Sequence, residues 1–147
     1  MSSKARRLDR LLAIRRLGED LDRRTLALAL ASVAEVEVAL ARQETTLVNA
    51  RLAARRALTV GDRGEWLMAD AQIEVAGWNR GRLGVLLEMR AGEVPPAMEK
   101  FLESRREHEQ VRQLVGNAQK AAEIEEGRKA QAASDDWFLS KHMRTTR

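Results

Sequence analysis

The fold of this chain is decided between Leu26 and Leu58, where the sequence reads LALALASVAEVEVALARQETTLVNARLAARRAL. Small and apolar residues recur there in two interleaved series, each with a period of seven and with one glutamine among them. The first series is Leu26, Val33, Leu40, Leu47 and Ala54, and the second is Ala29, Val36, Gln43, Ala50 and Ala57. Their alternating steps of three and four are the spacing of a coiled-coil seam. Since a narrow apolar stripe needs a second helix to cover it, this stretch predicts a coiled coil.

The composition favours long helices over a globular core. The chain has 147 residues, a length that suits one domain, with 33% charged and only 3% aromatic residues. Such a chain has too little bulky apolar material for a thick core. It has no cysteine, which excludes disulfides and thiolate sites and fits a reducing compartment. No run reaches the ~20 apolar residues of a membrane span, and Arg15 and Arg16 interrupt a signal-like run, so we expect a cytoplasmic protein.

A short turn is predicted at Gly61. Glycine is the usual residue just after a helix, and we expect helix one to cover about 4–59. Asp62 can cap the next helix, with Glu65 three residues on completing a capping box. Because a short connection between long helices makes them antiparallel neighbours, the sequence predicts an all-α, antiparallel two-helix coiled-coil hairpin.

Helix two is expected over about 63–134, followed by a tail at 135–147. Its own stripe is Trp66, Ala69, Ile73, Ala76, Arg80, Leu83 and Leu87. Folding back at the turn pairs residues whose numbers add up to about 123, which sets Leu40 against Leu83 and Leu21 near Phe101. From about Lys120 onward, helix two overhangs without a partner in the chain.

Two irregularities are expected in the helices. The early stripe of helix one does not run straight into the seam at Leu26, which predicts a register slip near residues 21–26. That early stripe is Leu11, Ile14, Gly18, Leu21, Thr25 and Leu28. Pro95 and Pro96 predict a break in helix two at about 91–95, because proline lacks the backbone donor and clashes with the preceding turn.

Three features exceed what a hairpin needs. The tail carries Trp137 and Phe138, which predict either an anchor for a partner pocket or a disordered tail whose apolar residues fold back. Trp78, Val85 and Met89 lie outside the seam. Trp78 either belongs to a second contact surface or lies over the seam edge against helix one. The glycines from Gly77 to Gly84 suggest a place where another backbone, of helix one or of a partner, comes close.

The N-terminal region is basic. Residues 1–24 hold eight basic and four acidic residues, in a chain of net charge +4. Such an end could meet nucleic acid, anionic lipid or an acidic protein, although a solvated helix flank is the favoured interpretation. Interleaved acidic residues and scarce aromatic residues argue against nucleic acid.

No catalytic constellation is found. His108 and His142 are expected to be solvated, and carboxylate pairs such as Glu125 and Glu126 lack the burial that tunes acid–base groups. No metal-ligand spacing and no phosphate loop occur. We therefore expect no enzyme, no cofactor, no metal and no small-molecule substrate.

Several motifs resemble the flagellar FliJ family, the coiled-coil protein of the flagellar type III export apparatus, with injectisome stalk proteins as cousins. They are the opening Arg7–Arg16 (RLDRLLAIRR), the turn followed by Trp66, the run Glu99–Arg106 (EKFLESRR), and Asp135–Asp136. The resemblance implies a non-catalytic stalk, similar to the central shaft of rotary ATPases, that lies at the inner face of the membrane export apparatus. It would join an export ATPase hexamer to a membrane export gate, and family members also handle export chaperones.

The resemblance also implies two sets of partner-binding residues. The ATPase end comprises Arg6, Arg7, Arg10, Asp135, Asp136, Trp137 and Phe138, and the gate face comprises Trp66, Ile73, Ala76 and Trp78. The chain departs from the family pattern at Gln72 and Ala76, where larger apolar residues can face the gate. An injectisome stalk, a generic helical scaffold and a nucleic-acid-associated protein that uses the basic N-terminus remain the alternatives.

Overall fold

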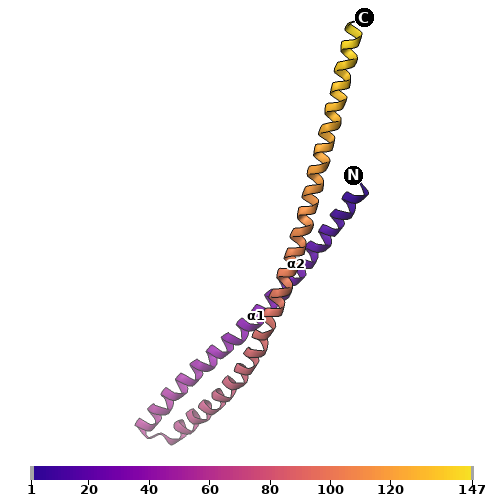
Figure 1. Ribbon diagram of the computed structural model, residues 1–147. Helices are drawn as coiled ribbons and strands as arrows, with labels where there is room; N and C mark the ends of the chain where they lie inside the picture. The colour runs from indigo at the N-terminus through magenta and orange to yellow at the C-terminus, as the bar shows by residue number, and fades with distance from the viewer. Residues whose placement is uncertain (1, 147) are drawn as a thin grey trace. The chain divides into compact units, whose positions relative to one another are not determined.

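Two helices make up the protein in a computed structural model that describes residues 2–146 (Figure 1). Helix α1 is Ser3–Val60 and helix α2 is Arg63–Thr145, and the two pack against each other without any strand in the described residues. The predicted all-α hairpin is therefore confirmed. Contacts divide it into two units, which are described separately. The turn unit is Leu21–Leu102, and the terminal unit joins α1 up to Asp20 with α2 from Glu103.

The turn has the predicted capping chemistry. Gly61 has a φ of 82°, in the left-handed region that favours glycine. The backbone N–H groups of Gly61 and Asp62 both donate to the carbonyl of Ala57, at 2.8 and 3.0 Å. On the other side, Asp62 Oδ1 accepts a hydrogen bond from the N–H of Glu65 at 3.1 Å. These contacts end α1 and start α2 within a few residues.

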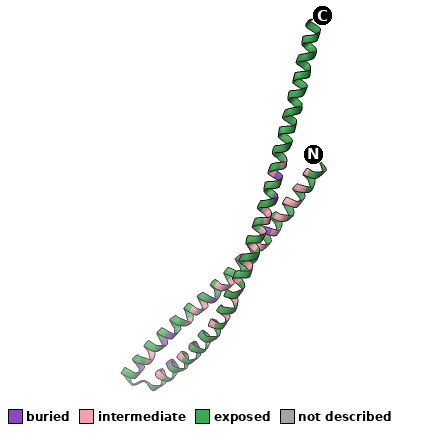
Figure 2. Ribbon diagram, in the orientation of Figure 1, coloured by how far each residue is buried: buried purple, intermediate pink, exposed green. Residues whose placement is uncertain are grey.

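The core of the turn unit is the predicted seam. All ten predicted α1 positions are buried or half-buried, and Figure 2 shows the purple and pink residues on the facing sides of the helices. The most deeply buried residues near the turn are small: Ala50, Ala57, Ala69 and Ala76. Small side chains allow the two backbones to approach closely, and the larger Leu26, Val36 and Leu47 are buried at other levels of the seam.

Polar contacts across the turn unit confirm the predicted pairing. Arg80 Nε lies 2.8 Å from Glu44 Oε1, and Lys100 Nζ lies 3.9 Å from Asp22 Oδ1. The guanidinium of Arg23 stacks over the ring of Phe101 at 5.5 Å. In each pair the residue numbers add up to about 123, as the position of the turn requires.

The predicted register slip at residues 21–26 is wrong. The buried and half-buried positions of α1 continue the same heptads toward the N-terminus, through Asp22, Glu19, Arg15, Leu12 and Leu8. Of the apolar residues expected in a shifted seam, Leu11 is half-buried, but Ile14, Leu21 and Leu28 are exposed, and so is Leu17. A continuous helix carries its register onward from Leu26, and the charged residues that then reach the seam have polar or charged partners on α2.

The predicted break at residues 91–95 is also wrong, because α2 is continuous and contains Pro95 and Pro96. Each proline lacks an N–H, which leaves the carbonyls of Ala91 and Gly92 without their helical donors. Both of those residues are exposed, so water can hydrate the carbonyls. The prolines themselves face solvent, and packing of the neighbouring half-buried residues against α1 outweighs the local preference for a break.

The C-terminal part of α2 is a single helix that reaches Thr145, well beyond the end expected near residue 134. Every described residue after Lys120 is exposed, so the predicted overhang is present. The segment expected as a tail at 135–147 is helical over its described residues up to Thr145, which excludes a disordered tail there. We call residues 120–145 the overhang. Neither helix, over the described residues, has a stretch long and apolar enough to cross a membrane.

Replacing Gly61 with alanine should destabilise the hairpin by about 1–2 kcal/mol, because an L-residue is strained at this positive φ. An added Cβ there would meet no atom within 4 Å, so the cost comes from the backbone alone. Urea unfolding followed by circular dichroism measures it. Gly64→Ala is the matched control, since its Cβ would make only an ordinary 3.6 Å contact with Asp62. Equal stabilities for the two variants would contradict the prediction.

The double variant Pro95→Ala/Pro96→Ala should be more stable than the natural chain by about 3 kcal/mol or more. Two alanines restore the missing N–H donors and remove the clash inside α2. A higher melting temperature, with equal or greater helical signal, is the expected result. A lower melting temperature would contradict the prediction. It would mean that the two prolines stabilise the packing of α2 although both are exposed.

Candidate functional site

Open hollows lie along the helices and at the turn of the described residues, so the candidate sites considered are surfaces. Over residues 2–146, no group of three or more histidine, aspartate or glutamate side chains could hold a metal ion. The features considered below are the polar part of the seam, the overhang, and the exposed faces of α2.

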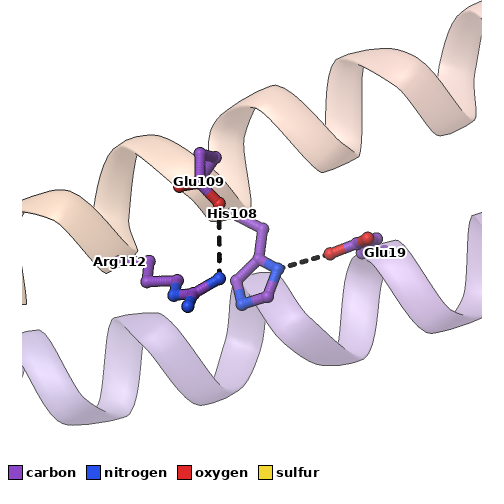
Figure 3. A network of polar contacts seen from close by, with 4 residues as sticks. All are labelled: Glu19, His108, Glu109 and Arg112. Atoms are coloured by element: carbon purple, nitrogen blue, oxygen red, sulfur yellow. Dashed lines mark hydrogen bonds and ion pairs between the residues drawn. The ribbon is translucent and has the colours of Figure 1, made fainter.

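Charged residues occupy the seam of the terminal unit. Glu19 of α1 is only 7% exposed, and His108 of α2 points toward its carboxylate, as Figure 3 shows. Arg15 Nη1 donates to Glu107 Oε2 at 2.7 Å, while Arg15 Nε is buried without a hydrogen-bond partner in the described residues. On the outer side of α2, Arg112 lies 3.7 Å from Glu109.

The expectation of a solvated His108 is therefore wrong. The sequence did contain a signal for its position, since counting heptads onward from Trp66 leads directly to residue 108. The apolar Val111 and Val115 follow it in the same seam and are buried. Buried charge pairs add little net stability compared with apolar pairs, but a misaligned register would leave each charge unpaired. These polar pairs therefore favour the observed register of the two helices over shifted registers.

The residues assigned to an ATPase end fall into two separate groups. Arg6, Arg7 and Arg10 are exposed on α1. Asp135, Asp136, Trp137 and Phe138 are exposed on the overhang, which continues beyond the last half-buried residue of α2, Ala118. At 1.5 Å per residue, Trp137 lies about 28 Å along the helix from Ala118. The structure does not bring the basic and the aromatic group together.

The aromatic group has a defined geometry. The rings of Trp137 and Phe138 meet edge to face, with centroids 5.3 Å apart and an interplanar angle of 82°. Lys141 Nζ lies 5.0 Å from the indole centroid. Both rings are more than half exposed, and Leu139 and Met143 beside them are also exposed. This concentration of apolar surface on an unpaired helix is typical of an interaction site.

The residues assigned to a gate face do not share one surface. Trp66 and Ile73 are half-buried in the seam, and Ala76 is only 2% exposed, so Ala76 is not available to a partner. Trp78 lies on a different face and is 73% exposed, with the guanidinium of Arg82 5.9 Å from its ring. Trp78 thus does not cover the edge of α1, and the first of its two predicted positions, on an exposed surface, is the one observed.

Sequence reasoning noticed part of that surface but missed its regularity. Exposed residues of α2 follow steps of three and four in a second stripe: Val75, Trp78, Arg82, Val85 and Met89. The glycines beside it do not serve contact with α1, because a Cβ at Gly77, Gly81 or Gly84 would meet no atom within 4 Å. Helix α2 therefore has a seam for α1 and a second stripe that the turn unit leaves uncovered.

Comparisons of this chain with models of protein families, with curated proteins and with solved structures find no match.

Removing one member of the polar pair in the seam should destabilise the hairpin more than removing both. His108→Ala leaves the Glu19 carboxylate buried with poorer compensation, at a cost of about 1–2 kcal/mol. Glu19→Leu/His108→Leu replaces the pair with apolar side chains and should be at least as stable as the natural chain. Thermal unfolding compares the three proteins, and a double variant less stable than His108→Ala would contradict the prediction.

Proposed function

We propose that this protein is a non-catalytic stalk of a type III protein export apparatus, which couples an export ATPase to a membrane export gate. Hydrolysis belongs to the ATPase ring, and the hairpin transmits or biases its rotation. The proposal combines the resemblance of the Arg7–Arg16 and Glu99–Arg106 motifs to the flagellar FliJ family with the two-helix coiled coil. An injectisome stalk would use the same geometry.

The overhang is the observation that carries the proposal. Helix α2 continues beyond the residues that pack against α1, and this unpaired part carries the exposed Trp137–Phe138 pair. A single charged helix has no intramolecular reason to carry two large aromatic residues, because their burial in a partner would gain far more free energy than exposure to water. Aromatic residues that insert into a partner pocket commonly dominate the binding energy of an interface. We assign this end to the ATPase ring, with Arg6, Arg7 and Arg10 as additional contacts.

The basic residues suit such a partner through electrostatics. Arg6, Arg7 and Arg10 are exposed on the first turns of α1 and make no ion pair in the described residues. Exposed charges of this kind mainly raise association rates and fix orientation. The turn and Trp66 then face the gate, as in the family that the motifs resemble.

The test is the hydrolysis rate of the organism's own export ATPase with and without this protein. We expect the intact chain to stimulate hydrolysis, and a version truncated after Ala133 to lose most of the stimulation. Trp137→Ala/Phe138→Ala should have the same effect without shortening the helix. Ile124→Ala is the matched control, because Ile124 is also an exposed apolar residue of the overhang but lies far from the aromatic pair.

Co-elution with the ATPase completes the experiment. An unchanged hydrolysis rate together with no co-elution would reject the ATPase as a partner and leave a helical scaffold. Stimulation that persists in both the truncated and the Trp137→Ala/Phe138→Ala proteins would reject the overhang as the contact.

A further inference from the structure

A groove runs along the turn unit between α1 and α2. Its lining is predominantly apolar and comes from both helices: Ala39 and Gln43 of α1, and Asn79, Arg82, Leu83, Val85, Leu86 and Met89 of α2. A second hollow on α1 shares Ala39 and extends to Val38 and Leu28. Together they form one elongated surface on a single unit of the protein.

Large apolar side chains on this surface are left in water. Val85 is 60% exposed and Met89 64% exposed, and Trp78 stands beside them on α2. On the α1 side, Val38 and Leu28 are also more than half exposed. Contiguous exposed apolar surface of this kind marks an interaction site. The steps of three and four from Val75 to Met89 match the spacing with which one helix receives another.

Two arginines flank the groove. Arg82 stands on the α2 wall, and Arg42 lines the adjoining hollow on α1. Their residue numbers add up to about 124, as do those of the observed Arg80–Glu44 pair, so they lie at the same level of the two helices. Within residues 2–146, neither makes an ion pair, whereas the neighbouring Arg90 lies 3.6 Å from Glu35. The hollow on α1 also contains Glu35, whose carboxylate is paired with Arg90, so the surface offers apolar contacts beside two arginines that lack a counter-charge.

We propose that this groove binds an amphipathic helix of a partner protein, which has an apolar seam flanked by aspartate or glutamate. The apolar seam packs on Ala39, Leu86 and Met89, and the flanking carboxylates pair with Arg42 and Arg82. The complex is a three-helix coiled coil over the turn unit. In coiled coils, charges that flank the seam decide which partner is accepted, and the two arginines have that role here.

A second copy of this chain fits the groove less well. A symmetric contact centred on Arg42 and Arg82 would bring these arginines of one copy against the same arginines of the other, and like charges in apposition are unfavourable. The overhang of another copy carries five acidic and five basic residues over 120–145, so it offers the arginines no net negative charge, and it could enter only by a head-to-tail contact that does not close. The proposal is independent of the stalk function, because it concerns neither the overhang nor an ATPase.

The experiment uses the full-length protein and two designed peptide helices of about three heptads. Both peptides carry the same apolar seam and a fluorescent label, and they differ only in having glutamate or lysine at every flanking position. Fluorescence anisotropy at low salt measures their binding. We expect the glutamate peptide to bind at least about tenfold more tightly than the lysine peptide. The variant Arg42→Glu/Arg82→Glu should reverse this preference.

Two further variants separate the charges from the packing. Arg51→Glu/Arg55→Glu changes the net charge of the turn unit equally at exposed positions of α1 that do not line the groove, and it should keep the preference for glutamate. Met89→Ser should weaken binding of both peptides severalfold without reversing their order. Circular dichroism confirms that each variant keeps its helical content.

Three outcomes would overturn the proposal. The first is equal binding of the two peptides, and the second is a preference that Arg42→Glu/Arg82→Glu leaves unchanged. The third is self-association, seen by light scattering at the concentrations of the binding assay, that Arg42→Glu/Arg82→Glu or removal of the overhang abolishes. That result would make a second copy the occupant of the groove.

Discussion

The structure depends on one interaction, the packing of two narrow apolar stripes along α1 and α2. Charged residues make up a third of the chain and aromatic residues are few, so this seam is the main source of apolar burial. Isolated helices of such composition are marginal in water, because most helical stability in proteins comes from tertiary packing. Near the turn the seam is built from alanines, which draw the backbones together. Its register is fixed there by the capping of Gly61 and Asp62.

A fixed register has consequences along each helix. The heptads that place Leu26 and Val36 in the seam also place Asp22, Glu19 and Arg15 there, and they leave Leu21 and Ile14 in solvent. Local preference alone would bury the leucines. The continuous helix does not permit that exchange, since a shift of register near residue 21 would have to unwind or overwind α1. Contacts with Lys100, His108 and Glu107 of α2 compensate for the partial burial of the polar side chains at these positions.

The same constraint accounts for the surfaces that a partner can reach. Many large apolar residues outside the chosen register are exposed, and on α2 four of them, Val75, Trp78, Val85 and Met89, form a regular stripe with Arg82. The overhang differs in origin, because it is exposed for lack of any α1 residue to face it. The two helices therefore carry two kinds of interaction surface, one on the side of the turn unit and one on the overhang.

Both functional proposals use this distinction. The stalk proposal relies on the overhang, where Trp137 and Phe138 are exposed, and on the family-like motifs Arg7–Arg16 and Glu99–Arg106. The groove proposal relies on the side of the turn unit, where Arg42 and Arg82 flank apolar residues. Each surface has its own chemistry, aromatic in one case and apolar between cations in the other, so each can select a different partner.

By itself, the sequence determined the hairpin, the turn at Gly61, the seam from Leu26 to Ala57 and the pairing of the two helices, because these follow from heptad spacing and capping residues within short distances. Only the tertiary structure decided which stripe of the N-terminal part of α1 is buried, whether α2 continues through Pro95 and Pro96, and that His108 faces Glu19. These outcomes depend on a register that is set tens of residues away and carried along a continuous helix. The candidate sites show the same division. The sequence identified Trp78 and Trp137 as unusual residues. It could not show that Ala76 is buried or that Arg42 and Arg82 flank one groove, since burial and the groove both depend on how the second helix packs.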